Sequence, residues 1–447
     1  MTKQYLSFSL VCLLWAAIAS CSATPTRLAL PWQPDHLTDL AYRVNAVVGP
    51  DGRKALMVDV AVSQEHGPLP NPLFLRINSN WAGQTDLGAD LDDLMAWSPD
   101  GTPLEAHLED GVARVEHSGI SSASLRYRVA PQTERLTAES RFRPISNRRT
   151  LVADGRHLFL WPESEAFEEA DWSVLLASGD WFSTHSASPH QTEFEGHART
   201  DLWDSSWLEG RHLDVGGVIA GRSIRLAVDP DSRLDTATLL TQISRVVAAA
   251  ERDFGPTPEP HTSVIVLRRA DQPDEFTGSG RRGGFVLELG DHAPIGSPDL
   301  AVLVAHEHLH RYIGLSMRFD DWDAMWTMWF REGVVSYLAA GLAYRASSTD
   351  AEQVLRTLSE AASGYLANPN NNRPLSEWSV SEYWSNLEMR RLAYEKGTLL
   401  AAWLDVALRE HGPTLAQFVA EFYASHQGET IDSTVINEAL QEALGRD

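Results

Sequence analysis

Short runs in which apolar and polar residues alternate, or in which β-branched residues cluster, fill the chain from about residue 40 to 150. Residues 55–62, 73–77 and 123–129 are three such runs, and turn signals such as the Pro-Asp-Gly at 50–52 separate them. A period of two predicts strands with one buried face, and short strands between turns are typical of an antiparallel sandwich. We therefore expect an N-terminal antiparallel β-sandwich-like domain over residues 40–150.

The hydrophobic period changes to that of a helix further along the chain. Residues 235–254 form an amphipathic pattern that ends at Gly255-Pro256, a pair that stops helices. Two strand-like runs follow at 263–268 and 284–289, and almost the whole chain beyond Pro298 has a helical pattern. This order of elements predicts an α+β fold with a helical C-terminal part.

Charge and composition narrow the function and the compartment. The formal net charge of −24 excludes nucleic acid as a partner, because phosphate binding requires a basic surface. Lys3 precedes a mostly apolar run over 6–19, which is shorter than the roughly 20 residues that span a bilayer. Such a run is typical of a signal peptide, which we place at residues 1–20.

The residues that follow this run predict a lipid anchor. Ile-Ala-Ser-Cys at 18–21 resembles a bacterial lipobox, in which Cys21 is lipidated and becomes the first residue of the mature chain. Residues 21–39 would then be a tether. We expect a lipid-anchored protein of the bacterial cell envelope, and Ser22 favours the outer membrane, facing the periplasm. A plain signal peptide that is cut nearby is the alternative.

A predicted helix that begins at Pro298 carries the strongest chemical signal. Ser297 and Pro298 are favourable residues for a helix start, and the apolar residues after them lead to His306-Glu-His-Leu-His310. Residues four apart lie on one face of a helix, so His306 and His310 can supply two ligands of one catalytic Zn²⁺ ion. Glu307 lies about 100° round the helix, where it can take a proton from the attacking water.

The third zinc ligand should be a carboxylate on a separate helix. Glu332 lies in the otherwise apolar run 329–338, where an unpaired acid would be costly. Residues 311–331 leave room for the end of one helix, a loop and the start of another. We therefore expect Glu332 to complete the site, and a glutamate exposed on a helix face is the alternative.

These motifs resemble those of the gluzincin metallopeptidases, in which HExxH is followed by a glutamate within W-x-x-E-G, as at residues 329–333. Tyr394-Glu-Lys-Gly397 resembles the Y-x-K-G element of the aminopeptidase-N/leukotriene-hydrolase group and of the glycyl aminopeptidases, the family that is more similar over the whole chain. The resemblance implies that Tyr394 donates a hydrogen bond to the oxyanion of the tetrahedral intermediate. Tyr383 is the second position considered for this role.

The resemblance also implies the domain arrangement. A β-rich segment and a thermolysin-like catalytic domain would occupy residues 151–345, and a helical region would occupy 346–447. The PDZ domain that is usual in glycyl aminopeptidases is not expected, because the chain ends at Asp447, soon after Gly397.

Residues 283–289 have the pattern of an edge strand, which could bind an extended peptide by strand addition. They lie in the region of the family's G-L-E-H element, whose glutamate holds the free amine of the substrate. The resemblance therefore points to Gly283, Gly284 and Glu288 as substrate-binding residues, although Glu288 is displaced from the family's pattern.

A second glycine pattern has a different interpretation. Residues 278–283 match GxGxxG, but a strand-like run follows where a dinucleotide site requires a helix, so we expect no nucleotide. No G-x-S-x-G elbow occurs, which leaves a serine hydrolase of the α/β type without support.

The sequence thus predicts a hydrolase: an aminopeptidase-like zinc metallopeptidase that cleaves peptide bonds of peptides or proteins in the bacterial cell envelope. A catalytically inactive lipoprotein that uses a peptidase fold for binding or scaffolding is the alternative from another class. A metal-dependent hydrolase of non-peptide bonds would share the same site and differ only in its substrate.

Overall fold

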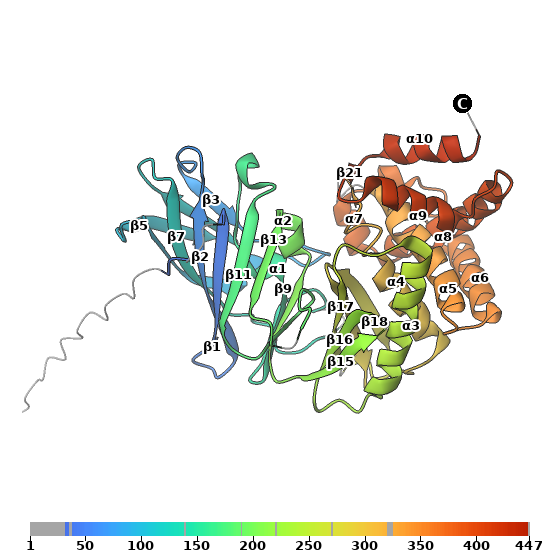
Figure 1. The fold of residues 1–447 in the computed structure, drawn as a ribbon, viewed down its shortest axis with the longest axis horizontal. Coiled ribbons are helices and arrows are strands. Elements are labelled where there is room, and N and C mark those ends of the chain that lie inside the picture. The colour runs from blue at the N-terminus through green and yellow to red at the C-terminus, as the bar shows by residue number, and fades with distance from the viewer. Residues whose placement is uncertain are drawn as a thin grey trace, which may run out of the picture.

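The protein has two halves that lie side by side along its longest axis (Figure 1). The structure, a computed structural model, describes residues 32–34, 38–137, 140–188, 190–219, 221–269, 271–319 and 325–445. One hydrophobic core lies among β-strands and a second lies among helices that cover a five-stranded sheet. The expected signal peptide, Cys21 and most of the expected tether lie outside the described residues.

The core of the β-rich half extends to Trp207, beyond the boundary that we expected at residue 150. Strand β1 (Leu40–Val48) pairs with β2 (Lys54–Ser63) on one side and runs parallel to β11 (Asp171–Ser178) on the other. Trp172 on β11 is buried in the same cluster as residues of β1 and β2. The boundary at 150 is therefore wrong, because alternation along the chain does not show which later strand completes a sheet.

Two sheets form this half. The larger has the order β10-β3-β6-β5-β4-β7-β2-β1-β11-β13, and the smaller has the order β12-β14-β9-β8. The strands expected at 55–62, 73–77 and 123–129 are confirmed as β2, β3 and β7. The other elements are β3 (Leu73–Arg76), η1 (Leu87–Asp90), β4 (Leu91–Trp97), β5 (Pro103–Glu109), β6 (Val112–Glu116), β7 (Ser122–Val129), β8 (Ile145–Ser146), β9 (Thr150–Asp154), α1 (Gly155–Leu158), β10 (Trp161–Pro162), η2 (Glu165–Phe167), β12 (Trp181–Ser183), β13 (Glu193–His197), α2 (Arg199–Trp203) and β14 (Ser206–Gly210).

The five-stranded sheet of the second half has the order β15-β16-β17-β19-β18, which leaves β18 at an edge. Its strands are β15 (Leu213–Ile219), β16 (Arg222–Val228), β17 (His261–Arg269), β18 (Phe276–Arg281) and β19 (Gly284–Gly290). The predicted helix before β17 is confirmed as α3 (Thr236–Phe254). The Asp235 side chain caps its first turn, and Gly255, with a φ of 81°, ends it.

Helices make up almost all of the chain after this sheet. Most of them share one apolar core with α3 and the sheet, and Figure 1 shows them at the end of the molecule away from the β-rich half. The elements are α4 (Pro298–Leu309), β20 (Arg318–Phe319), η3 (Met325–Thr327), η4 (Trp329–Val334), α5 (Val335–Arg345), α6 (Ala351–Ala367), η5 (Leu375–Glu377), α7 (Val380–Ser385), α8 (Leu387–Arg409), α9 (Leu415–His426), β21 (Thr430–Ile431) and α10 (Ser433–Ala443).

This arrangement confirms the α+β fold with an N-terminal β-rich part and a helical C-terminal part. Within the ranges that the structure describes, none of the helices combines the length and the apolar character that crossing a bilayer requires.

Candidate active site

Helix α4 begins as its sequence predicts and brings two histidines onto one face. The Ser297 hydroxyl accepts a hydrogen bond from the backbone N–H of Leu300, and Pro298 occupies the first turn. Apolar side chains bury the helix against the sheet and α5. At its C-terminal end the Nε2 atoms of His306 and His310 lie 3.1 Å apart.

Glu332 completes a group of three donor atoms. It lies on η4, a π-helical turn that leads into α5. Its Oε2 atom is 3.3 Å from Nε2 of His306 and 3.6 Å from Nε2 of His310. Donors about 2.1 Å from a tetrahedral zinc ion are about 3.4 Å from one another. The three separations therefore have the size that one zinc ion requires.

The charge states of these side chains suit a divalent cation. Burial opposes ionisation of Glu332, but the two imidazoles outweigh it and lower its pKa to about 2. Burial lowers the pKa of His310 to about 4, so this imidazole is neutral near pH 7. Burial would also lower the pKa of His306, but Glu332 and Glu307 raise it on balance. A metal ion binds the neutral form of each imidazole, so its binding at this site depends on pH.

A further side chain orients His306. The Ser336 hydroxyl, on α5, lies 3.3 Å from Nδ1 of His306. A hydrogen bond at Nδ1 fixes the ring so that Nε2 faces the other two donors. Oε2 of Glu332 is buried and makes no well-directed hydrogen bond, and a buried oxygen in this position is satisfied by a cation.

Glu307 lies between the donor group and the edge strand β18. The side chain is 5% exposed, and a Cβ on Gly278 would lie 2.6 Å from its Cγ. Burial, helped by the charge of Glu332 and opposed by His306, raises the pKa of Glu307. A carboxylate with a raised pKa beside the donor group is suited to act as a general base.

The glycines of β18 have a role that the sequence analysis did not find. Gly278 packs on Glu307, and a Cβ on Gly280 would lie 2.6 Å from the Cβ of His310. These glycines let the strand lie directly on α4. The GxGxxG match at 278–283 covers the later part of β18 and the turn that leads to β19, and close packing explains its first two glycines.

Two other glycines bring Tyr394 to the site. A Cβ on Gly333 would overlap the Cα of Gly397, so η4 and α8 cross with their backbones in contact. Gly333 follows Glu332, and Gly397 lies one turn after Tyr394. The crossing therefore places the tyrosine beside Glu332, which gives a physical reason for both the E-G pair and the Y-x-K-G element.

Tyr394, rather than Tyr383, contacts the donor group. Its ring stacks on the His306 imidazole at a centroid distance of 5.9 Å and an angle of 25°. Desolvation, followed by the charge of Glu332, raises the pKa of Tyr394 well above its usual value, so the hydroxyl remains able to donate. Tyr394 is 38% exposed, whereas Tyr383 is only 2% exposed. Tyr394 is thus placed to meet a substrate.

The predicted edge strand is a different strand from the observed one. Strand β19 lies between β17 and β18, so Gly284 and Glu288 are in the interior of the sheet and β18 is the edge. Glu288 is buried, lies 3.4 Å from Arg141, and its pKa is raised by burial. Gly283 is pressed against Thr184. These residues do not line the cavity, because they lie on or next to β19. That strand is one position further into the sheet than the edge strand β18.

The donor group opens into a cavity of about 420 Å³. One wall consists of α4, η4 and α8, and the opposite wall includes Trp81, Arg141, Arg156 and Asp204 from the β-rich half. The sequence alone does not predict this second wall, since its residues lie far from the zinc motif along the chain and carry no motif of their own.

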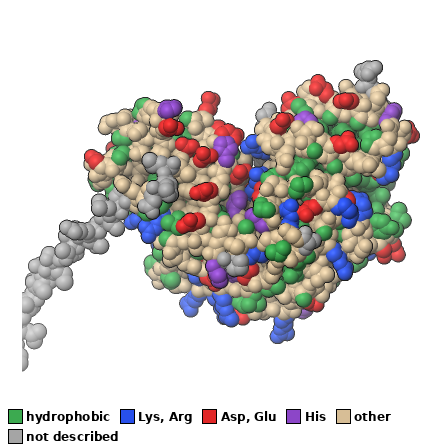
Figure 2. Space-filling view, viewed as in Figure 1, with side chains coloured by type: hydrophobic (Ala, Val, Ile, Leu, Met, Phe, Trp, Pro, Cys, Tyr) green, Lys and Arg blue, Asp and Glu red, His purple; other side chains and the backbone are tan. Residues whose placement is uncertain are grey.

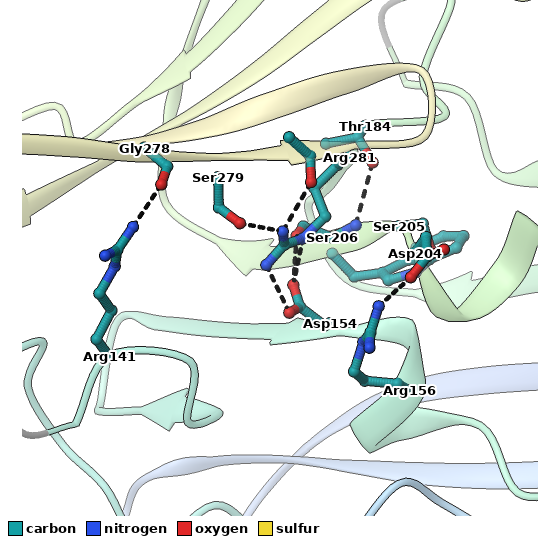
Figure 3. A network of polar contacts seen from close by, with 12 residues as sticks. Arg141, Asp154, Arg156, Thr184, Asp204, Ser205, Ser206, Gly278, Ser279 and Arg281 are labelled. Atoms are coloured by element: carbon teal, nitrogen blue, oxygen red, sulfur yellow. Dashed lines mark hydrogen bonds and ion pairs between the residues drawn. The ribbon is translucent and has the colours of Figure 1, made fainter. Parts of the chain in front are cut away.

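A polar network joins the two halves next to the cavity (Figure 3). The Arg281 guanidinium, on β18, donates to both carboxylate oxygens of Asp154 at 2.7 and 3.0 Å. Arg141 donates to the carbonyl of Gly278, and Arg156 pairs with Asp204. Side chains of the β-rich half thus hold the edge strand on which Glu307 packs.

Comparison with known proteins agrees with this site. Residues 299–400 match the family model of the M61 glycyl aminopeptidases. This segment contains the three donor residues, Glu307 and Tyr394. No curated protein matches the chain in sequence.

Solved structures show the same fold over most of the chain. An aminopeptidase N family protein from Idiomarina loihiensis has a TM-score of 0.73 at 17% identity, over 89% of this chain and 73% of that one. An M1 zinc metallopeptidase from Deinococcus radiodurans has a TM-score of 0.60 at 15% identity, over 91% and 90%. A mutant of that enzyme with a bound Tyr-Ser-Ala substrate is equally similar, with a TM-score of 0.60 at 15% identity over 91% of each chain.

The family match and the donor group lead to one conclusion. The chain is an aminopeptidase-like zinc metallopeptidase, a hydrolase with Zn²⁺ as its cofactor, and its segment 299–400 is similar to the M61 glycyl aminopeptidases. The expected resemblance to the glycyl aminopeptidases is confirmed.

Proposed function

We propose that this metallopeptidase hydrolyses peptide bonds in the bacterial cell envelope, to which a lipid on Cys21 anchors it. The arrangement of His306, His310 and Glu332, with separations of 3.1 to 3.6 Å, is the observation that supports hydrolysis most directly. The lipobox-like residues 18–21 support the anchor.

Each residue of the site has a defined part in the reaction. A zinc ion held by the three donors supplies Lewis-acid polarisation of the scissile carbonyl. Glu307 takes a proton from the attacking water and delivers it to the leaving amine. The Tyr394 hydroxyl donates a hydrogen bond to the oxyanion, which carries more charge than the ground-state carbonyl, so this bond is stronger in the transition state.

The test of hydrolysis is the substitution Glu307→Gln in protein loaded with zinc. Product analysis of a peptide library that includes Tyr-Ser-Ala should show cleavage that a chelator abolishes. The substitution should lower the rate by about 10²- to 10⁴-fold while the zinc content, measured by atomic emission, stays at that of the wild type. Glu360→Gln, an exposed glutamate on α6, is the matched control. A folded, zinc-loaded wild type that cleaves nothing would support the scaffolding alternative.

The test of the anchor is Cys21→Ser in cells that export the protein. The wild type should partition into the detergent phase, and its N-terminal peptide should carry the mass of acyl chains. The variant should move to the aqueous phase. A wild-type chain that is aqueous, with an unmodified N-terminus, would overturn the anchor and leave the peptidase proposal untouched.

A further inference from the structure

Arginine is concentrated in the cavity of a protein whose net charge is strongly negative. The formal charge of the chain is −24, and Figure 2 shows acidic side chains spread over both halves of the viewed face. The cavity nevertheless has six arginines in its lining: Arg141, Arg156, Arg281, Arg331, Arg390 and Arg391. A basic cavity in an acidic protein attracts anions to that one place.

Acidic partners already engage four of these arginines. Arg156 pairs with Asp204, Arg281 pairs with Asp154, and Arg141 pairs with Glu288. Arg391 is largely exposed and lies 3.6 Å from Glu388 one turn away. These four guanidinium groups therefore add little net positive charge to the cavity.

Arg390 differs from them. Among the described residues no carboxylate lies within ion-pair distance of its guanidinium, and its Nε atom is buried without a hydrogen-bond partner. It lies on α8 four residues before Tyr394, and both residues line the cavity, so a single helical turn separates them. A guanidinium in this position needs an acceptor, which an anionic ligand would supply.

The edge strand reinforces this preference. The Gly278 carbonyl already accepts from Arg141, and the Gly280 carbonyl accepts from Arg281 at 2.8 Å. In an antiparallel strand the N–H and C=O of one residue point the same way, so the N–H groups beside these carbonyls remain as donors. This side of the cavity therefore offers donors to a ligand and has few acceptors for an ammonium group.

One acid in the cavity lining, Glu395, belongs neither to the zinc and proton-transfer groups nor to an arginine pair. Its side chain is directed toward a neighbouring helix. Glu395 packs on Gly364 of α6 and accepts from Asn368. It is therefore engaged with the neighbouring helix and not with the space in front of Tyr394.

We propose that the cavity selects peptides with a carboxylate close to the scissile bond and that Arg390 is the residue that binds this carboxylate. The inference rests on the proposed peptidase function, since it names the substrate class of the same site. The carboxylate could come from an acidic side chain or from the C-terminus of a short peptide, and both would make the same charge-assisted hydrogen bonds.

The test is binding to zinc-loaded Glu307→Gln protein, which keeps the ligand intact during calorimetry. Four versions of one tripeptide carry glutamate or glutamine next to the scissile bond and a free or an amidated C-terminus. We expect at least one carboxylate to tighten binding by about tenfold over its amide. Adding Arg390→Met should reduce that ratio to about one, and Arg390→Lys should restore part of it. Arg356→Met, an arginine on α6 outside the cavity lining, should keep the full ratio.

The outcomes separate the two proposals. Equal binding of all four peptides, or a ratio that survives Arg390→Met, overturns the carboxylate inference even if the wild type cleaves peptides. A carboxylate preference that depends on Arg390, in a protein without zinc-dependent cleavage, upholds the inference and overturns the peptidase function. The glutamine and amide arms show which carboxylate is recognised.

Discussion

The two walls of the cavity are built in opposite ways. The metal wall comes from one short stretch of chain, in which His306 and His310 share a helix and Glu332 lies on the next helical segment. The facing wall joins parts of the chain that are far apart. Arg141 of the β-rich half lines it and donates to Gly278 of the edge strand. Behind it, Asp154 of the same half pairs with Arg281 of that strand. The chemistry is local in sequence, whereas substrate recognition depends on how the halves are joined.

This difference means that the two walls should fail in different ways. Damage to the metal wall should remove zinc and activity but leave the junction of the halves intact. Damage to the facing wall should weaken the junction and the fit of substrate while zinc stays bound. Four substitutions test this contrast.

The largest effect is expected from Glu332→Ala. Removing the only carboxylate of the donor group leaves two imidazoles, which hold zinc far more weakly. Atomic emission after dialysis should show that the bound zinc is lost, and hydrolysis should fall to background. The circular dichroism spectrum should match that of the wild type. Retention of a full equivalent of zinc would show that Glu332 is not a ligand.

Asp154→Asn should affect the facing wall. It leaves the buried Arg281 guanidinium without its charge partner, which costs about 3–5 kcal/mol of the free energy of unfolding. Zinc content should not change. Asp291→Asn, which breaks the partly exposed pair with Arg268, should cost less than about 1 kcal/mol. An equal cost for the two variants would contradict a structural role for the junction.

The cost of Asp154→Asn should also depend on pH. Burial alone would raise the pKa of Asp154, but Arg281, His157 and Arg156 outweigh it and lower the pKa on balance. The carboxylate therefore stabilises the fold above its unfolded pKa of about 4 and loses this effect as the pH falls below that value. Unfolding in denaturant at several pH values should show the two proteins converging in acid.

Tyr394→Phe removes the hydroxyl group that we propose as the oxyanion donor and keeps the aromatic ring. We expect kcat to fall by about 10²-fold with little change in KM, because the hydrogen bond forms mainly in the transition state. Tyr383→Phe should have a much smaller effect, since that side chain is almost fully buried and only Tyr394 stacks on His306. The reverse order of the two effects would assign the oxyanion role to Tyr383.

Gly333→Ala should have the smallest effect. The added methyl group forces η4 and α8 apart, at a cost of about 1–3 kcal/mol in stability. Because Tyr394 lies on α8, kcat should fall together with the stability, but by less than in Tyr394→Phe. Gly341→Ala, in α5, meets only the end of the Arg345 side chain and should leave both quantities nearly unchanged.

The sequence predicted the metal wall well and the facing wall poorly, for a physical reason. A helix fixes the relation of His306 to His310 by its own period, so their meeting did not depend on the rest of the fold. Glu332 could be predicted as the third ligand, because an unpaired acid in an apolar helix is costly. Which strand lies at the sheet edge depends on pairing between distant segments, so β19 was mistaken for the edge and Glu288 for a ligand-binding residue.

The parallel pairing of β1 with β11 was hidden for the same reason. We expected a β-rich segment to begin at residue 151, but nothing local indicated that its strands would join the sheet of the first strands. Arg390 and the arginines of the β-rich half were likewise invisible, since isolated arginines in a sequence have no pattern until the fold gathers them.

The hairpin of β18 and β19 is held at its tip by Asp154 and supports Glu307 along its length. A rotation of the β-rich half would tilt this hairpin and so displace Glu307 from the water that we propose it deprotonates. The orientation of the two halves is therefore coupled to the proton transfer itself, and a ligand that bridges them would hold the enzyme in its working geometry.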